Sequence, residues 1–98
     1  MKKKEINTEL APTAIGTDSQ AVQCGNMIFI SGQIPLDPNT CTLVSKDFSA
    51  QLHQVFKNLS AISHAAGGDL NQIAKLNIYL LDFNHFQTVN TIMAEYFN

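Results

Sequence analysis

The feature that most constrains this 98-residue chain is a helical repeat of apolar residues in its middle. The repeating residues lie three or four positions apart: Phe48, Leu52, Val55, Phe56, Leu59 and Ile62. This spacing predicts one amphipathic helix, with Asp47 or Ser45 as its N-terminal cap and Gly67-Gly68 at its end. A chain of this length has room for one domain, so we expect residues 1–98 to pack around this helix as a single unit.

Short strands are predicted before the helix. Residues 21–24 and 27–34 are strand-like, and Gly25-Asn26 between them suits the positive φ angles of a two-residue hairpin. Residues 3–8 alternate weakly and predict a first strand, and residues 41–44 predict a short extended piece that can pair. Prolines at 35 and 38 mark the loop between these segments.

The second half predicts one more strand and one more helix. Residues 73–81 carry apolar side chains on both faces, a pattern typical of a central strand. A helix is predicted from Asn84, capped by that side chain with Gln87 reaching back, and its buried stripe is Phe86, Val89, Met93 and Phe97. The resulting order, β-β-β-α-β-α, indicates an α+β protein with two helices on one face of a mixed sheet.

The end of the sequence departs from this pattern. A helix that follows a strand in this way normally leads into another strand, and here nothing follows Asn98. The sequence therefore leads us to expect a fragment or an unusual variant in which the C-terminal strands are missing.

Composition excludes several classes of protein. Apolar residues make up 45% and charged residues 14%, against about 25% charged in typical domains, which excludes disorder and favours burial against partner subunits. The net charge is −2, there is no arginine, and three of the six lysines cluster at residues 2–4, so nucleic-acid binding is not expected. No run is long enough to span a membrane.

The cysteines and histidines indicate neither a disulfide framework nor a metal site. Two cysteines, Cys24 and Cys41, without a secretion signal suggest reduced thiols in a cytoplasmic protein. His53, His64 and His85 lie too far apart for a local metal motif, so no metal or other cofactor is expected.

Two stretches resemble the RidA/YjgF family. They are residues 11–16 (Ala-Pro-Thr-Ala-Ile-Gly) and residues 25–35 (Gly-Asn-Met-Ile-Phe-Ile-Ser-Gly-Gln-Ile-Pro). The similarity continues through the helix at 51–67, residues 73–80, Asp82 and residues 86–90, and it covers nearly the whole chain.

The resemblance implies a chorismate-mutase-like fold, a homotrimer with clefts between subunits, and a cofactor-free activity. Members of the family hydrolyse reactive enamines and imines, such as 2-aminoacrylate and 2-iminobutanoate, to 2-oxo acids and ammonia. Older names for the family are endoribonuclease L-PSP and translation inhibitor.

By the same resemblance, four residues are expected to bind substrate. Ser31 and Gly32 match the family's cleft wall, Asn90 matches a cleft asparagine, and Asp18 stands where the family usually has a tyrosine. The family's carboxylate-binding arginine, a nearby cysteine and a water-positioning glutamate would all lie beyond Asn98, so the catalytic set is incomplete in this chain.

Both the site residues and the function have a simpler alternative. Ser31-Gly32 can be a strand end with a glycine for close backbone approach, and Asn90 can lie on a solvated helix face. The alternative to an imine deaminase is a non-catalytic module of the same fold that binds small carboxylates or a partner protein. A ribonuclease ranks third because positive charge is lacking.

Overall fold

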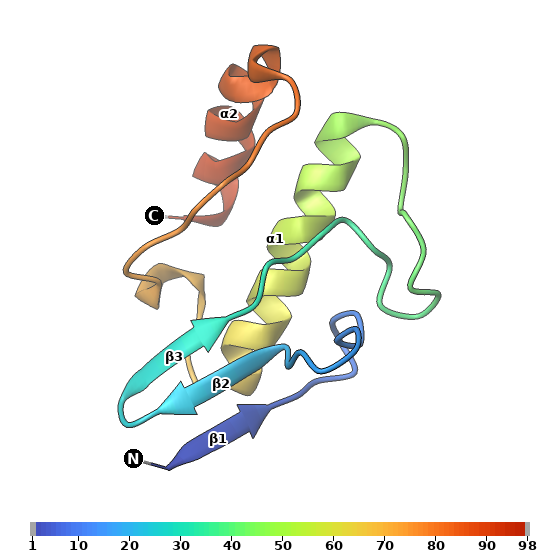
Figure 1. Ribbon diagram of the computed structural model, residues 1–98. Coiled ribbons are helices and arrows are strands. Elements are labelled where there is room, and N and C mark those ends of the chain that lie inside the picture. The colour runs from blue at the N-terminus through green and yellow to red at the C-terminus, as the bar shows by residue number, and fades with distance from the viewer. Residues whose placement is uncertain (1, 98) are drawn as a thin grey trace.

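The computed structural model describes residues 2–97 and forms an α+β arrangement of one antiparallel sheet and two α-helices (Figure 1). The elements are β1 (Lys3–Ile6), β2 (Ala21–Cys24), β3 (Met27–Ile30), α1 (Phe48–Ala65), the 3₁₀ turns η1 (Leu70–Gln72) and η2 (Phe83–His85), and α2 (Phe86–Tyr96). In Figure 1, α1 lies across one face of the sheet, and α2 lies beside α1.

The sheet has the order β1-β2-β3, and both pairings are antiparallel. Ala21 lies opposite Ile6 on one side and Ile30 on the other, so β2 is the central strand. The β2–β3 hairpin closes through Gly25-Asn26 as predicted, with Gly25 at a φ of 64°. The prediction of a positive φ at Asn26 as well was wrong, because this turn needs a left-handed residue only at its first position.

Helix α1 begins and ends where its sequence signals predict. The Asp47 Oδ2 atom accepts a hydrogen bond from the Ala50 backbone nitrogen at 2.9 Å and thereby satisfies one of the free N–H groups of the first turn. At the other end, Ala66 is the C-cap and Gly67 has a φ of 92°, a conformation that glycine adopts without steric cost.

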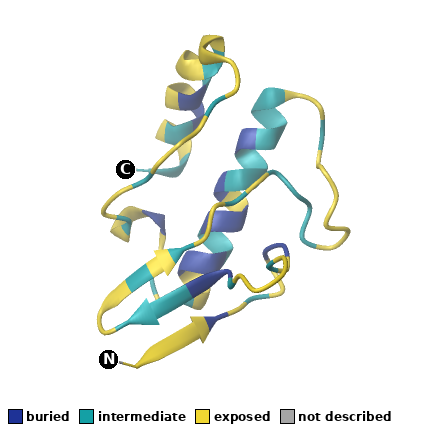
Figure 2. Ribbon diagram, in the orientation of Figure 1, coloured by how far each residue is buried: buried dark blue, intermediate teal, exposed yellow. Residues whose placement is uncertain are grey.

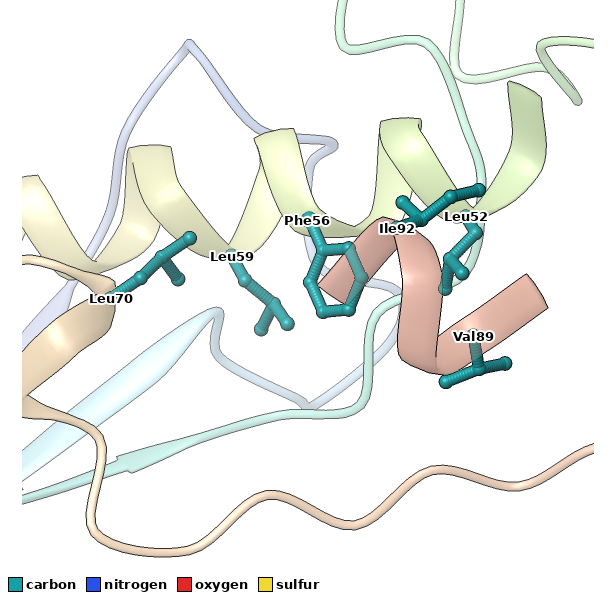
Figure 3. Packing of buried hydrophobic residues seen from close by; sticks show 6 residues of the cluster. All are labelled: Leu52, Phe56, Leu59, Leu70, Val89 and Ile92. Atoms are coloured by element: carbon teal, nitrogen blue, oxygen red, sulfur yellow. The ribbon is translucent and has the colours of Figure 1, made fainter. Parts of the chain in front are cut away.

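Two clusters of buried side chains form the core, both on the inner side of α1 (Figures 2 and 3). The larger cluster joins α1 to α2 and η1 through Leu52, Phe56, Leu59, Leu70, Val89 and Ile92. The smaller joins α1 to the sheet through Ile62, Ile6, Ala11 and Ala21. Phe56 is 1% exposed, and burial of a side chain of this size contributes about 1.5–3 kcal/mol.

Helix α2 starts later than predicted, and its buried stripe is confirmed in part, because Val89 is buried and Met93 and Phe97 pack against the larger core cluster. Asp82, not Asn84, provides the cap, because its side chain accepts a hydrogen bond from the Asn84 nitrogen and opens the 3₁₀ turn η2 before the helix. Val89 is buried as predicted. Ile92, which the prediction missed, is buried too, whereas Phe86 is 50% exposed.

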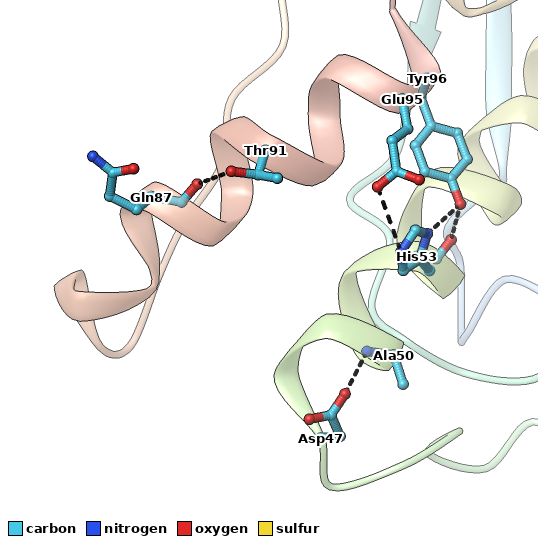
Figure 4. A network of polar contacts seen from close by, with 7 residues as sticks. All are labelled: Asp47, Ala50, His53, Gln87, Thr91, Glu95 and Tyr96. Carbon is cyan, nitrogen blue, oxygen red and sulfur yellow. Dashed lines mark hydrogen bonds and ion pairs between the residues drawn. The ribbon is translucent and has the colours of Figure 1, made fainter.

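A polar contact also fixes α2 against α1 (Figure 4). The Tyr96 hydroxyl lies 2.7 Å from His53 Nδ1, and Glu95 Oε2 lies 4.0 Å from His53 Nε2. The Tyr96 ring packs on Phe56 with ring centroids 5.0 Å apart. The end of α2 is therefore held by both aromatic packing and a hydrogen bond.

The predicted strand at 73–81 and the predicted mixed sheet are corrected by the structure. Residues 73–81 run extended but pair with no strand among residues 2–97, so the sheet is three-stranded and purely antiparallel. The predicted cover on both faces is absent too, because none of these residues is buried and Tyr79 is 90% exposed. A strand also needs a hydrogen-bonding neighbour. The first strand ends at Ile6 rather than residue 8, and the extended piece at 41–44 forms a single bridge, Leu43 to Leu36.

Candidate functional site

A shallow hollow of about 130 Å³ opens beside the carboxyl end of β3. Two loops form its walls: residues 12–20, which precede β2, and residues 31–36, which follow β3. The lining residues include Asp18, Ser31 and Gly32, three of the four predicted substrate-binding residues. The hollow is small against the roughly 300–1,000 Å³ of drug-sized sites, so it suits a metabolite of a few heavy atoms.

Two hydrogen bonds to the residues just before β2 position Ser31. Its backbone nitrogen donates to Gln20 O at 3.0 Å, which extends the β2–β3 ladder by one pair. Its hydroxyl donates to Ser19 O at 2.5 Å. Since a hydroxyl has one proton, the Ser31 oxygen is left to accept hydrogen bonds from a ligand rather than to donate them.

Gly32 leaves the floor of the hollow open. A Cβ built at this position would meet no atom within 4 Å. The alternative that the glycine is needed for close backbone approach is therefore not supported by any contact among the described residues. The space over Gly32 is available to a ligand or to another subunit.

Asp18 is an exposed residue at the end of a tight turn. Its nitrogen donates to Ile15 O at 3.3 Å, and Gly16 within the turn has a φ of 67°. Of the described residues that line the hollow, only Asp18 carries a charge. The hollow therefore presents an acidic group and has no lysine or arginine within its lining.

The buried Gln20 holds the first wall, a role that the sequence did not reveal. Its side-chain amide nitrogen donates to the carbonyl oxygens of Thr8, Ala11 and Pro12 at 3.0, 3.2 and 2.8 Å. Its amide oxygen accepts from the Thr8 nitrogen at 2.6 Å. One side chain thus ties the loop that carries Pro12 to the start of β2.

Asn58 holds the second wall in the same way. It is fully buried on α1, and its Nδ2 atom donates to Leu36 O at 3.1 Å and to Ile34 O at 3.4 Å. Its Oδ1 atom accepts from Gln54 Nε2 at 2.8 Å. An asparagine in the middle of a helix, where it is a poor helix former, was the available signal for this role.

Asn90, the fourth predicted residue, is not part of the hollow. It lies on an exposed position of α2 and is absent from the hollow's lining. Within residues 2–97 no cluster of three histidine, cysteine or acidic side chains is placed to hold a metal ion, and no helix is long and apolar enough to cross a membrane.

Comparison with known proteins shows the family. A family model described as Endoribonuclease L-PSP matches residues 8–98. The chain belongs to the RidA/YjgF/L-PSP family. Among relatives, a RutC family protein of Pyrococcus horikoshii is 48% identical over 95 residues, which are 97% of this chain and 75% of that protein. The 2-iminobutanoate/2-iminopropanoate deaminase of Mus musculus is 46% identical over 97% of this chain and 70% of its own length.

Solved structures confirm the fold of a RidA family member. The crystal structure of RidA from the Antarctic bacterium Psychrobacter matches 97% of this chain with a TM-score of 0.92 and 44% identity. That match covers 76% of the Psychrobacter protein. The chain therefore spans about three quarters of the length of each of these three relatives.

Proposed function

We propose that the Asp18–Ser31–Gly32 hollow is the site at which a protein of this family hydrolyses reactive enamines and imines to 2-oxo acids and ammonia. The main support is that the hollow brings three of the predicted residues together. In addition, relatives of this chain include proteins named 2-iminobutanoate/2-iminopropanoate deaminase. The substrate class comes from those names, and the site from the geometry.

The reaction needs little from the protein beyond binding. A protonated imine has an electrophilic carbon, to which water adds to give a carbinolamine. A proton then moves from oxygen to nitrogen, the carbon–nitrogen bond breaks, and ammonia leaves as the carbonyl forms. The protein has to hold the planar substrate and place a water molecule, and neither task calls for a metal or a covalent nucleophile.

The hydrogen-bonding groups of the hollow favour the nitrogen end of such a substrate. The Ser31 oxygen and the Asp18 carboxylate both accept hydrogen bonds, so both suit a protonated imine nitrogen. A substrate carboxylate is best held by the two parallel N–H groups of arginine, and the 98 residues contain none. We therefore expect the 98-residue chain alone to bind such compounds weakly and to hydrolyse them slowly.

A coupled assay tests this proposal. A pyridoxal-phosphate dehydratase generates 2-aminoacrylate or 2-iminobutanoate, and ketoacid formation is followed with the 98-residue chain or with a chimera extended by the unmatched C-terminal part of the Pyrococcus relative. We expect the chimera to be faster by at least about a hundredfold, since one charged, oriented contact is commonly worth 3–5 kcal/mol.

Matched variants locate the site within the chimera. Asp18→Asn and Ser31→Ala, which alter the hollow, should lower the chimera's rate, and Asn90→Ala tests the fourth predicted residue. Equal rates for the 98-residue chain and the chimera would show that the hollow alone suffices. An unchanged rate in both Asp18→Asn and Ser31→Ala would move the site elsewhere.

The proposed assembly is a cytoplasmic homotrimer in which a neighbouring subunit completes each cleft. The open side of the hollow and exposed apolar residues such as Ile15, 74% exposed beside it, support a second wall from another chain. The same exposed surface supports the second candidate function, a non-catalytic interaction module. A folded chimera that assembles but shows no hydrolysis would favour that alternative.

A further inference from the structure

The charge of the hollow beside β3 comes from one side chain. Residues 12–15, 18–20, 31–34 and 36 line the hollow, and among them only Asp18 carries a charge. The neutral amide and hydroxyl groups of the other lining residues can donate hydrogen bonds to an anion, but none of them offsets the charge of the carboxylate. The potential inside the hollow therefore favours a cation over an anion.

A second hydrogen-bond acceptor is held beside the segment that carries Asp18. The Ser31 hydroxyl donates its proton to the carbonyl oxygen of Ser19, the next residue along the chain from Asp18. This hydrogen bond leaves the Ser31 oxygen with lone pairs to offer and no proton to give. A ligand that contacts both the Ser31 oxygen and the Asp18 carboxylate must therefore donate a hydrogen bond to each of them.

The size and the apolar lining of the hollow limit the shape of such a ligand. A volume of about 130 Å³ holds only a few heavy atoms. Pro12, Ile15, Ile34 and Leu36 give the hollow apolar walls, and Gly32 adds no side chain to its floor. A small flat group with N–H donors at one end and a short alkyl group at the other fits these walls and both acceptors.

We propose that the hollow binds small planar cations of the amidinium and protonated-imine type, and that Asp18 determines this specificity. The N–H groups of the ligand donate to the Asp18 carboxylate and to the Ser31 oxygen. A carboxylate is well matched to planar nitrogen cations, because two N–H groups lying side by side can bond to its two oxygens. A ligand with a carboxylate in place of these N–H groups is repelled by Asp18.

Where the ligand is an imine substrate, this inference rests on the proposed function. It then names the form of the substrate that the hollow takes, which is the protonated imine with its C=NH₂⁺ group. The same site distinguishes substrate from product, because the 2-oxo acid keeps a negative carboxylate and has no N–H group to donate. The cation specificity itself rests only on the charge and the acceptors of the hollow, so it can be tested without catalysis.

The test compares three ligands of the same planar shape that differ in charge: acetamidinium, acetamide and acetate. Each is titrated into the full 98-residue chain, and binding is followed through the NMR shifts of the backbone amides. We expect acetamidinium to give saturable shifts within residues 12–20 and 31–36, with a dissociation constant in roughly the millimolar range because so small a ligand makes few contacts. Acetamide should bind about tenfold more weakly, since it lacks the charge, and acetate should not saturate.

Two variants that remove one negative charge provide a matched pair. Asp18→Asn keeps the shape of the side chain inside the hollow, and Glu9→Gln removes the same charge at an exposed position outside the lining. We expect Asp18→Asn to weaken acetamidinium binding about tenfold and Glu9→Gln to change it by less than about twofold. Raising the ionic strength from about 0.01 to about 1 M should weaken binding to the parent, but much less to Asp18→Asn, because salt screens exposed charges.

Four outcomes would overturn the proposal. They are no saturable binding of acetamidinium, equal affinity for the three ligands, equal effects of Asp18→Asn and Glu9→Gln, and shifts confined to residues outside the two loops. Tighter binding of acetate than of acetamidinium would also contradict it, since the neutral amides of the lining would then outweigh the charge of Asp18.

The deaminase assay separates this inference from the proposed function. In an active chimera, acetamidinium should raise KM without changing kcat, and Asp18→Asn should abolish that inhibition. A chimera that hydrolyses no imine, together with Asp18-dependent binding of acetamidinium to the 98-residue chain, would refute the proposed function and support the cation site. An active chimera that acetamidinium does not inhibit would refute the cation site and leave the proposed function standing.

Discussion

Replacing Gln20 tests whether a single buried amide supports the wall of the candidate site. The Gln20→Ala variant removes all four hydrogen bonds that the side chain makes to residues 8, 11 and 12. Two of the groups left behind, the carbonyl oxygens of Ala11 and Pro12, take part in hydrogen bonds that are buried in the parent. The variant therefore leaves polar groups without partners rather than merely shortening a side chain.

The expected loss of stability is large for a domain of this size. An unsatisfied buried polar group costs about 1–3 kcal/mol, so two carbonyls together with the lost Thr8 contacts should lower the free energy of unfolding by roughly 3 kcal/mol. Small domains are stable by only about 5–15 kcal/mol. At about 4–8 °C per kcal/mol for 60–100 residues, the midpoint of thermal unfolding should fall by roughly 12–24 °C.

A second variant separates hydrogen bonding from packing. Gln20→Glu keeps the volume of the side chain but replaces its donor nitrogen with an oxygen that faces the three carbonyl oxygens. These carbonyls and burial should raise the pKa of the introduced carboxyl in the folded state. The penalty should then be smallest below the unfolded pKa of about 4.3 and should grow as the pH rises through the folded value.

Urea unfolding followed by circular dichroism at acidic and neutral pH measures both effects. We expect the free energy of unfolding of Gln20→Glu to fall more than that of the parent between acidic and neutral pH. The difference between Gln20→Ala and the parent should be the same at both pH values. A loss under about 1 kcal/mol for Gln20→Ala, or a pH-independent Gln20→Glu, would show that water replaces the amide and that Gln20 does not anchor the loop.

Three further predictions concern the rest of the molecule. Burial, and then the charge of Glu95, raise the pKa of Tyr96 above 10.0. The stability linked to its phenol proton is therefore present below about pH 10 and is lost as the pH rises above it. In the Tyr96→Phe variant, the free energy of unfolding should fall less steeply at alkaline pH. Light scattering at micromolar concentration should give the mass of three chains, and a purely monomeric protein would contradict the proposed trimer. Filter binding should show weak or no affinity for single-stranded RNA at physiological salt, because outside Lys2–Lys4 three lysines face eight acids. Sub-micromolar, salt-sensitive binding that survives deletion of those three lysines would contradict this.

The fold was predictable where the signals lie within a few residues of one another. The stripe from Phe48 to Ile62, the Asp47 cap and the Gly67 stop all act within α1, and the structure confirms each of them. The strand predicted at 73–81 failed for the opposite reason. An apolar pattern shows which side chains favour burial, but burial and strand formation both need a partner segment, and that partner is not local in sequence.

The same division applies to the candidate site. All four site residues were predicted from the family resemblance. Ser31 and Gly32 lie just past the end of β3, and the structure brings Asp18 to the same hollow. Asn90 lies on α2, away from the hollow's lining. Gln20 was missed because its partners lie 8 to 12 residues away, and no local pattern marks such a contact.

The two anchoring amides explain how an exposed site can keep a defined shape. Both walls of the hollow are loops, and a loop held only by its own turns would change conformation easily. Gln20 fixes one wall to the start of the central strand, and Asn58 fixes the other to the middle of the longest helix, where the side chain is fully buried. The groups that we propose contact a ligand, Ser31 and Asp18, are exposed and make few contacts within the chain. Substitutions at Ser31 and Asp18 should therefore change binding with little effect on stability, whereas substitutions at Gln20 and Asn58 should change both, because the shape of the hollow depends on the core of the fold.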